Sequence, residues 1–235
     1  LLDGRLEFGD IDVDELNFKL TTYKDSINSN LEVFIDKLDD GKPREPGTPP
    51  FFFSASNLNV RNSTFKMIDE NLERSKTLDF TDLKIVSSDF QILGPEVTTA
   101  ISAMSFNTAQ GIQVDDLKTD FKYTKQQMRF DSLAIRTPGS FLNGNLIFNY
   151  ERKDFADFLN KVKVAAEFRE STVAFDEVNL LYDQFGQGKE VAFSATMKGV
   201  LNDLDVEDLF LQSDNTGIRG DFNFKHLFSK KDPFV

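Results

Sequence analysis

The clearest feature of this chain is a regular alternation of apolar and polar side chains. In residues 142–150, 161–169 and 218–225, nearly every second position is apolar, and the positions between them carry mainly charged residues or asparagine. Successive side chains of a β-strand point to opposite faces of the sheet. The alternation therefore predicts strands of a sheet that has one apolar face and one solvated face.

The same reasoning predicts strands along most of the chain. Turn-forming pairs such as Gly94-Pro95 and Pro138-Gly139 separate many of them. Residues 37–50 hold four prolines and two glycines, which predicts a loop or linker between a strand segment at 1–36 and the main β-structure at 51–235. The predicted strands are 5–9, 13–22, 30–36, 51–60, 63–69, 78–87, 89–93, 96–106, 111–123, 127–137, 140–150, 160–169, 171–180, 189–200, 204–213 and 216–225.

One segment has the spacing of a helix. Residues 154–162 place Phe155, Phe158, Leu159 and Val162 at positions i, i+3, i+4 and i+7, which form one apolar stripe. Asp154 is the candidate N-cap. We expect this helix to fold over one end of the sheet as a plug or a cross-connection, and a second short turn to lie within 176–185.

A local repeat recurs at irregular intervals. It consists of an apolar residue, two usually polar residues, a leucine or valine, any residue, and usually a second apolar residue. The three-residue step breaks strict alternation. A β-bulge at the polar pair would return both apolar positions to one face and increase the twist of the strand. The copies are 13–18, 80–85, 130–135, 175–180 and 206–211, with a weaker copy at 114–119.

Composition narrows the classes of function but leaves two architectures open. A net charge of −12 argues against nucleic acid as a partner, and the absence of cysteine excludes thiol chemistry, disulfides and cysteine-ligated zinc. The chain has 25 Phe, 4 Tyr and no Trp, and 40% of its residues are hydrophobic. A single sheet with one wet face and a conventional sandwich with long polar loops both fit these values. Because the first residues already alternate and no initiator Met is present, we expect a section of a larger protein.

The sequence offers little for catalysis. His226 is the single histidine, and no Gly-x-Ser-x-Gly motif accompanies it. The acidic pairs at 39–40 and 115–116 and the acids at 203 and 205 lack the spacing of a calcium-binding EF-hand loop. Residues 186–189 read Gly-Gln-Gly-Lys without the full phosphate-loop spacing, so they indicate a hairpin turn. We expect no enzyme activity, no cofactor and no metal site.

The apolar faces of the strands must pack against something or bind a partner. If the sheet closes or stacks on another sheet, they form an ordinary core, and alternation alone favours that interpretation. If the sheet curls into an open trough, they form a long apolar groove. Such a groove would bind acyl chains with a gain of about 0.8 kcal/mol for each buried methylene group.

Three stretches of the main β-structure carry a resemblance to a known family. Each is a degenerate strand pattern, and their order and density make the likeness, which covers most of residues 51–225. They read LDFTDLKI at 78–85 with GPEV at 94–97, GIQVDDLKTDFKY at 111–123 with MRFDSL at 128–133, and GVLNDLDVEDL at 199–209 with GIRG at 217–220.

These stretches resemble the AsmA-like superfamily, and within it the TamB-like translocation and assembly module proteins of the Bacteroidota type. The resemblance implies an all-β fold, an elongated curled antiparallel sheet called a β-taco, with an apolar inner groove and one or two short helices. It also implies a periplasmic location, an inner-membrane anchor outside this chain, and phospholipid transport between the membranes. An Omp85-type outer-membrane barrel protein is the implied partner, through parts of the protein not in this chain.

The resemblance and the alternation together give a set of candidate groove residues. Their role would be passive, because they would line a path for phospholipid acyl chains. One rival function is a scaffold that holds outer-membrane protein clients by strand-edge pairing. Another is a sugar-active or adhesive β-protein, which would predict aromatic platforms of Trp or Tyr. The candidate lining residues are Phe121, Tyr123, Phe130, Leu142, Leu146, Phe148, Val162, Val164, Phe168, Val191, Phe193, Met197, Ile218, Phe222 and Phe224.

Overall fold

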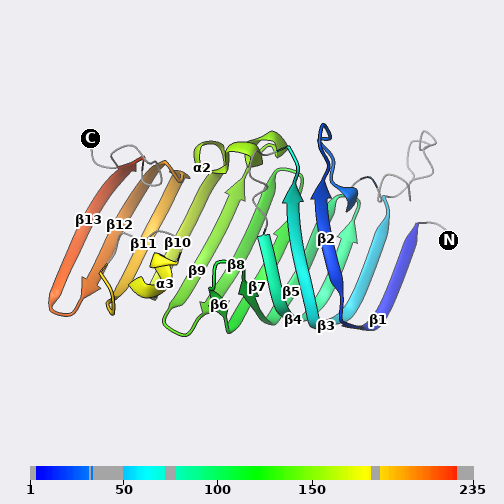
Figure 1. Cartoon of the computed structure of the whole chain (residues 1–235), viewed down its shortest axis with the longest axis horizontal. Coiled ribbons are helices and arrows are strands. Elements are labelled where there is room, and N and C mark those ends of the chain that lie inside the picture. The colour runs from blue at the N-terminus through cyan, green and yellow to red at the C-terminus, as the bar shows by residue number, and fades with distance from the viewer. Residues whose placement is uncertain (1–3, 32, 34–49, 72–77, 181–185, 227–235) are drawn as a thin grey trace.

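A computed structural model of the chain describes residues 4–31, 33, 50–71, 78–180 and 186–226. These residues form one 13-stranded sheet in the order β1-β3-β4-β5-β7-β8-β9-β10-β11-β12-β13, with β2 paired to β3 and β6 paired to β5 (Figure 1). The strands are β1 Arg5–Asp14, β2 Asn17–Thr22, β3 Phe52–Asp69, β4 Leu78–Leu93, β5 Glu96–Thr108, β6 Gln113–Val114, β7 Asp116–Tyr123, β8 Gln127–Arg136, β9 Phe141–Asn149, β10 Lys163–Ala174, β11 Glu190–Val200, β12 Asp203–Ser213 and β13 Thr216–Lys225.

The predicted all-β fold, a single curled sheet with short helices, is confirmed. The sheet is not closed, and most neighbouring strands are antiparallel. The exceptions are β1 and β2, which both pair parallel with β3, so the sheet is mixed at this end. A parallel pair needs a long crossover connection, and the chain between Thr22 and Phe52 supplies it.

Several predicted strand boundaries change in the structure. The strands predicted at 5–9 and 13–22 are β1 and β2, and the break between them lies at residues 15–16. The predicted strand 111–123 is divided into β6 and β7. The pairs 51–60 with 63–69 and 78–87 with 89–93 are each one long strand, β3 and β4. The prediction of a strand at 30–36 is wrong where the structure describes it, because Asn30, Leu31 and Val33 are helical. The Asn30 side chain favours this local turn by accepting hydrogen bonds from the backbone N–H groups of Thr21 (2.9 Å) and Leu31 (3.0 Å).

A further change is at the predicted strand 171–180, which ends early. It joins 163–169 in β10, and the chain then turns into the short helix α3, Phe175–Asn179. The Glu177 carboxylate accepts hydrogen bonds from the Thr137 hydroxyl (2.6 Å), the Gly139 N–H (2.9 Å) and the Ser140 hydroxyl. These contacts fix α3 against the β8–β9 turn, so this copy of the repeat is helical and forms no bulge.

The predicted helix at 154–162 is present as two short helical pieces. They are the 3-10 helix η1, Arg152–Asp157, and the α-helix α2, Phe158–Lys161. Asp154 is the third residue of η1 and not its N-cap, and its carboxylate accepts a hydrogen bond of 2.7 Å from the Glu151 N–H. The helical segment starts two residues earlier than predicted, because Glu151 is the N-cap.

The bulges predicted at the polar pairs of the repeat are present on several strands. On β12, the register shifts between Val206 and Leu209, and Asp208 adopts a left-handed φ of 52°. On β8, it shifts between Phe130 and Leu133, and Ser132 has a φ of 51°. Further left-handed residues inside strands, with φ between 47° and 52°, are Asn62, Asp82, Asp89 and Glu170.

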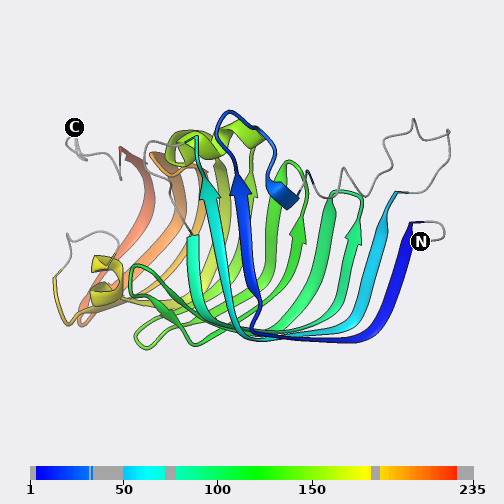
Figure 2. The ribbon, with the colours of Figure 1, turned by 45° about the vertical axis from the view of Figure 1, so that its right-hand side comes forward.

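The bulges explain the direction in which the sheet curls. Val206 and Leu209 are buried, whereas Glu207 and Asp208 between them are exposed. Each bulge therefore adds a residue to the polar face and none to the apolar face. The polar face becomes the longer one and each strand bends toward the apolar face. Figure 2 shows the resulting trough, with β1 at one end and β13 at the other.

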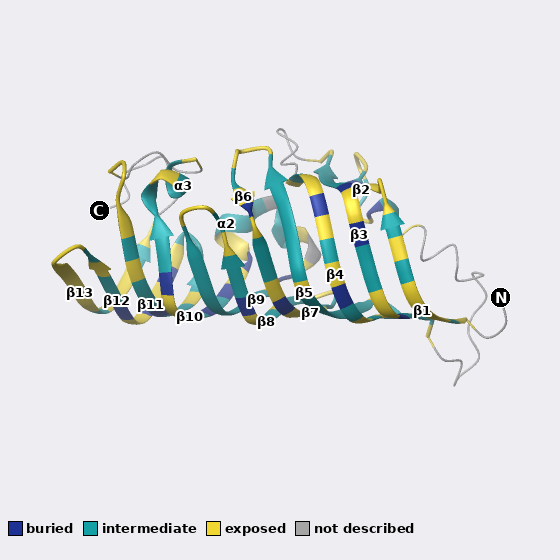
Figure 3. Ribbon diagram, turned by 90° about the horizontal axis from the view of Figure 1, so that it is seen from below, coloured by how far each residue is buried: buried dark blue, intermediate teal, exposed yellow. Residues whose placement is uncertain are grey.

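Strands without these bulges carry small residues at the same bend. Register places Thr119, Gly144, Ala195 and Gly220 beside the bulges of β8, β10 and β12. A Cβ atom at Gly144 would approach the Glu167 carbonyl oxygen to 1.9 Å. Small side chains thus let neighbouring backbones meet where the sheet turns. Figure 3 shows that buried positions recur from strand to strand while much of the ribbon stays exposed.

Candidate functional site

Strand register brings the candidate groove residues onto one side of the sheet. Directly paired residues of neighbouring strands project to the same face. One row of paired residues crosses seven strands, β7 to β13, without a polar member. The row is Phe121, Phe130, Leu146, Ala166, Met197, Val206 and Phe222.

A second row lies parallel to the first and nearer one rim. It crosses the same seven strands and is also apolar apart from the hydroxyl of its first residue. Together with the first row it defines what we call the inner face, the concave side of the sheet. The second row is Tyr123, Met128, Phe148, Val164, Gly199, Leu204 and Phe224.

The remaining candidates extend the inner face on the other side of the bend. Leu142 pairs with Ile135, and Val191 pairs with Val173. Phe193 and Ile218 both pair with Leu211, while Phe168 pairs with Gly144 and Ala195. Val162 precedes β10 and is fully buried. The structure thus places all fourteen strand candidates on one continuous face, with Val162 at its rim.

The inner face continues beyond the residues that the sequence singled out. Aromatic rings of β1, β3 and β4 follow one another as Phe8, Phe53 and Phe90, with centroids 5.3 and 6.0 Å apart. A second series joins β2 to β5, with spacings of 5.7, 5.7 and 4.2 Å; it is Phe18, Phe65, Phe80 and Phe106. Phe80 opens a copy of the repeat, which is the signal that could have identified it.

Most of these rings are only half-buried. Every phenylalanine that the structure describes keeps part of its surface accessible, including Phe121, Phe130 and Phe168. Phenylalanine is normally among the residues most often buried in a core. The fully buried positions of the inner face are smaller side chains near the bend, such as Ala195 and Val206. The rings therefore line an accessible surface instead of filling a closed core.

Two tyrosines, Tyr123 and Tyr150, lie close together on the inner face. Burial raises the pKa of Tyr150, and the nearby Tyr123 phenol raises it further. Burial also raises the pKa of Tyr123. The Tyr150 hydroxyl donates a hydrogen bond of 3.0 Å to the Thr124 carbonyl oxygen. Both phenols therefore stay neutral well above physiological pH.

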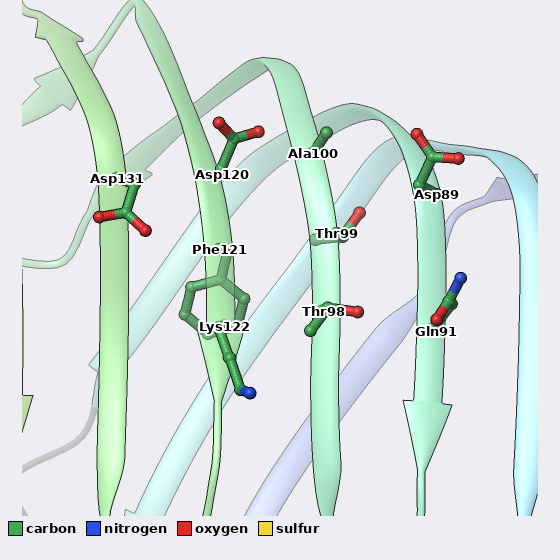
Figure 4. A pocket seen from close by; sticks show the side chains of 9 residues that line it. All are labelled: Asp89, Gln91, Thr98, Thr99, Ala100, Asp120, Phe121, Lys122 and Asp131. Atoms are coloured by element: carbon green, nitrogen blue, oxygen red, sulfur yellow. The ribbon is translucent and has the colours of Figure 1, made fainter.

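The outer face of the sheet is mainly polar and is shallowly hollowed. One depression lies beside the left-handed residue Asp89, and Figure 4 shows the side chains that line it, among them Asp120, Lys122 and Asp131. Asp120 and Asp131 are directly paired across β7 and β8, and Arg129 contacts Asp131 at 2.6 Å. Among the residues that the structure describes, no three acidic or histidine side chains are grouped to hold a metal ion.

The residues considered for catalysis or calcium binding take part in ordinary hydrogen bonds and ion pairs within the protein. The His226 N–H donates to the Asn202 carbonyl oxygen at 2.7 Å, at the end of β13. Asp116 forms an ion pair of 3.2 Å with Lys118, and Asp203 and Asp205 both accept hydrogen bonds from Asn223. The acidic pair at 39–40 lies outside the described residues.

Within the described residues, no helix is long and apolar enough to span a membrane. Comparison with family models, with curated proteins and with solved structures found no match for this chain.

Proposed function

We propose that this chain is a section of a TamB-like bridge that conducts phospholipids along its inner face between the inner and outer membranes and supports outer-membrane protein assembly. The observation that carries the proposal is the pair of seven-residue apolar rows on an open sheet. The proposed role is non-catalytic. Its periplasmic location, its inner-membrane anchor and its Omp85-type partner belong to the same proposal and rest on the sequence resemblance.

The energetics favour acyl chains as the occupant. Each methylene group moved from water to an apolar surface gains about 0.8 kcal/mol. The rows run across the strands and therefore along the trough, so a chain could move from one strand to the next over similar side chains. A charged headgroup is costly to bury and would stay in water at the mouth. Selectivity would come from apolar length and not from a polar pocket.

The accessible rings argue for a conduit over an ordinary core. In a closed sandwich, a second layer would cover Phe121, Phe130 and Phe168. Among the described residues, no second sheet lies over the inner face. Phe222 on β13 is 38% exposed and Ile218 is 52% exposed. Exposed apolar side chains that form one contiguous face mark an interaction site.

A transfer assay between donor and acceptor vesicles tests the proposal. Phe222→Asp should reduce the rate of transfer of a fluorescent phospholipid at least about tenfold, because an unpaired carboxylate in an apolar path costs several kcal/mol. Gln212→Asp adds the same charge on the outer face of β12 and is the control. Circular dichroism and thermal unfolding would show that both variants keep the fold. Unimpaired transfer by Phe222→Asp would overturn the proposal.

One observation favours a second candidate function, a scaffold for unfolded outer-membrane proteins. The outer edge of β13 has no strand partner among the described residues, and it is ten residues long without a proline. Such an edge can accept a further strand. A photoreactive residue in place of Arg219 would then crosslink to unfolded client protein, and edge substitutions would impair activity more than inner-face substitutions.

A further inference from the structure

The helical segment η1–α2 places aromatic rings on the inner face. The Phe158 ring lies 5.7 Å from the ring of Phe148, a member of the second apolar row. The Phe155 ring lies 4.5 Å from the ring of Tyr150, at the end of β9. The segment sits at the upper rim in both views of the trough (Figures 1 and 2). Two phenylalanines thus cover the surface on which an acyl chain would lie.

Two hydrogen bonds from Asn202 tie this segment to the turn between β11 and β12. The Asn202 N–H, in the β11–β12 turn, donates a hydrogen bond of 3.0 Å to the Leu159 carbonyl oxygen. The Asn202 side-chain amide donates another to the Asn160 side chain at 3.0 Å. None of the residues of α2 is fully buried, and Phe155 and Phe158 are half-buried.

The secondary structure of the segment is weak by itself. A 3-10 helix has poorer hydrogen-bond geometry than an α-helix, and a four-residue α-helix has little stability of its own. Segments with few buried contacts open locally at low free-energy cost. In contrast, Val162, the residue at which the segment joins β10, is fully buried and provides a fixed hinge.

We propose that η1–α2 is a displaceable cover, in which Phe155 and Phe158 occupy the acyl-chain path when no lipid is bound. A passing chain replaces the two rings against Phe148 and Tyr150, and the segment pivots away from the β11–β12 turn. Lipid binding and docking of the segment therefore compete for one surface, so each lowers the occupancy of the other. This inference rests on the proposed lipid-conducting function.

Photo-crosslinking at two inner-face positions separates this inference from the function itself. A photoreactive residue replaces either Phe148, beneath the segment, or Phe168, on β10 away from its ring contacts. The probe is a vesicle of phosphatidylglycerol with a labelled fraction. Phe158→Ser, which removes one ring pair, should raise the lipid adduct at position 148 by about threefold to tenfold. It should change the adduct yield at position 168 by less than about twofold relative to the protein that keeps Phe158.

A reversible disulfide that locks η1–α2 to the β11–β12 turn should have the opposite effect on the adduct yield at position 148. The chain has no cysteine, so the pair Asn160→Cys and Asn202→Cys can be joined by oxidation to a disulfide without side reactions. The lock should suppress the adduct at position 148, and reduction of the disulfide should restore it. The matched control joins Asp205→Cys to Asn223→Cys on the outer face, where the native side chains lie 2.7 Å apart.

The outcomes distinguish the two claims. One outcome is that adducts form at position 168 while the adduct yield at position 148 changes neither with Phe158→Ser nor with the lock. This result would overturn the cover and leave the conduit intact. No adduct at either position in any variant would overturn the conduit and the cover with it. Hydrogen exchange adds a lipid-independent check, because the Asn202 and Val162 N–H groups bonded to the segment should exchange faster than the N–H groups within β10.

Discussion

The Asp221 carboxylate on β13 accepts a hydrogen bond of 2.9 Å from the backbone N–H of Asp208, the left-handed residue at which β12 bulges. The same relationship recurs on two other strands. Asn145 accepts from the Ser132 N–H at 2.9 Å, and the Ser194 hydroxyl accepts from the Glu170 N–H at 3.2 Å. A polar side chain of the following strand thus satisfies the N–H group that each bulge removes from the ladder.

This relationship predicts the effect of removing the acceptor. Asp221→Ala should lower the free energy of unfolding by about 1 kcal/mol relative to Asp221→Asn, because asparagine keeps the acceptor oxygen. Both variants remove the same negative charge beside Asp208, so their difference isolates the hydrogen bond. Urea denaturation measures it. Equal stability of the two variants would show that the bulge needs no cap from β13.

The bend should not tolerate a side chain at Gly144. Gly144→Ala would press its methyl group on the Glu167 carbonyl oxygen, 1.9 Å from the ideal Cβ position. We expect a loss of about 3 kcal/mol, at the upper end of the range for overpacking. Gly9→Ala is the control, since nothing lies within 4 Å of its Cβ position, and it should change stability by less than about 0.5 kcal/mol. Thermal unfolding measures both changes. Equal stability of the two variants would contradict the close approach of Gly144 to the Glu167 carbonyl oxygen.

The buried phenols predict a loss of stability at alkaline pH. Because the pKa of Tyr150 is raised in the folded protein above its ordinary value of 10.0, the unfolded chain loses this proton first as pH rises. The contribution of the neutral phenol is fully present below about pH 10 and is lost as pH rises through the folded pKa. Tyr150→Phe should flatten the decline of unfolding free energy between about pH 9 and 11. Tyr23→Phe, which removes an exposed phenol, should retain the steeper decline.

Much of the fold could be predicted from the sequence because alternation and turn chemistry are local. The faces of β9, β10 and β13 follow directly from strict alternation, and the bulges at Asp208 and Ser132 follow from the three-residue step between apolar residues. The repeat pattern does not predict the bulge at Glu170, because Ser171 occupies the position that is usually leucine or valine. Its hydroxyl is buried and donates to the Arg169 carbonyl oxygen at 3.2 Å, which satisfies it there.

The other features of the fold depend on contacts between residues far apart in the sequence, which a local pattern does not reveal. Parallel pairing of β1 with β3 leaves the same alternation as antiparallel pairing would. The helical turn at Phe175 depends on contacts of Glu177 with a loop about 40 residues earlier. The sequence of β5 does not assign its faces, because apolar residues occur on both of them. Register resolves it by pairing Val97 with Tyr123.

Photo-crosslinking within one strand can compare the two faces of the sheet as surfaces for lipid. Phe168 and Glu167 are neighbours on β10 and face opposite sides of the sheet. A photoreactive residue at each position, in cells that carry labelled phospholipid, compares the two faces at the same place in the fold. We expect lipid adducts at Phe168 and none at Glu167. Equal adducts at both positions, or none at Phe168, would contradict a lipid-conducting inner face.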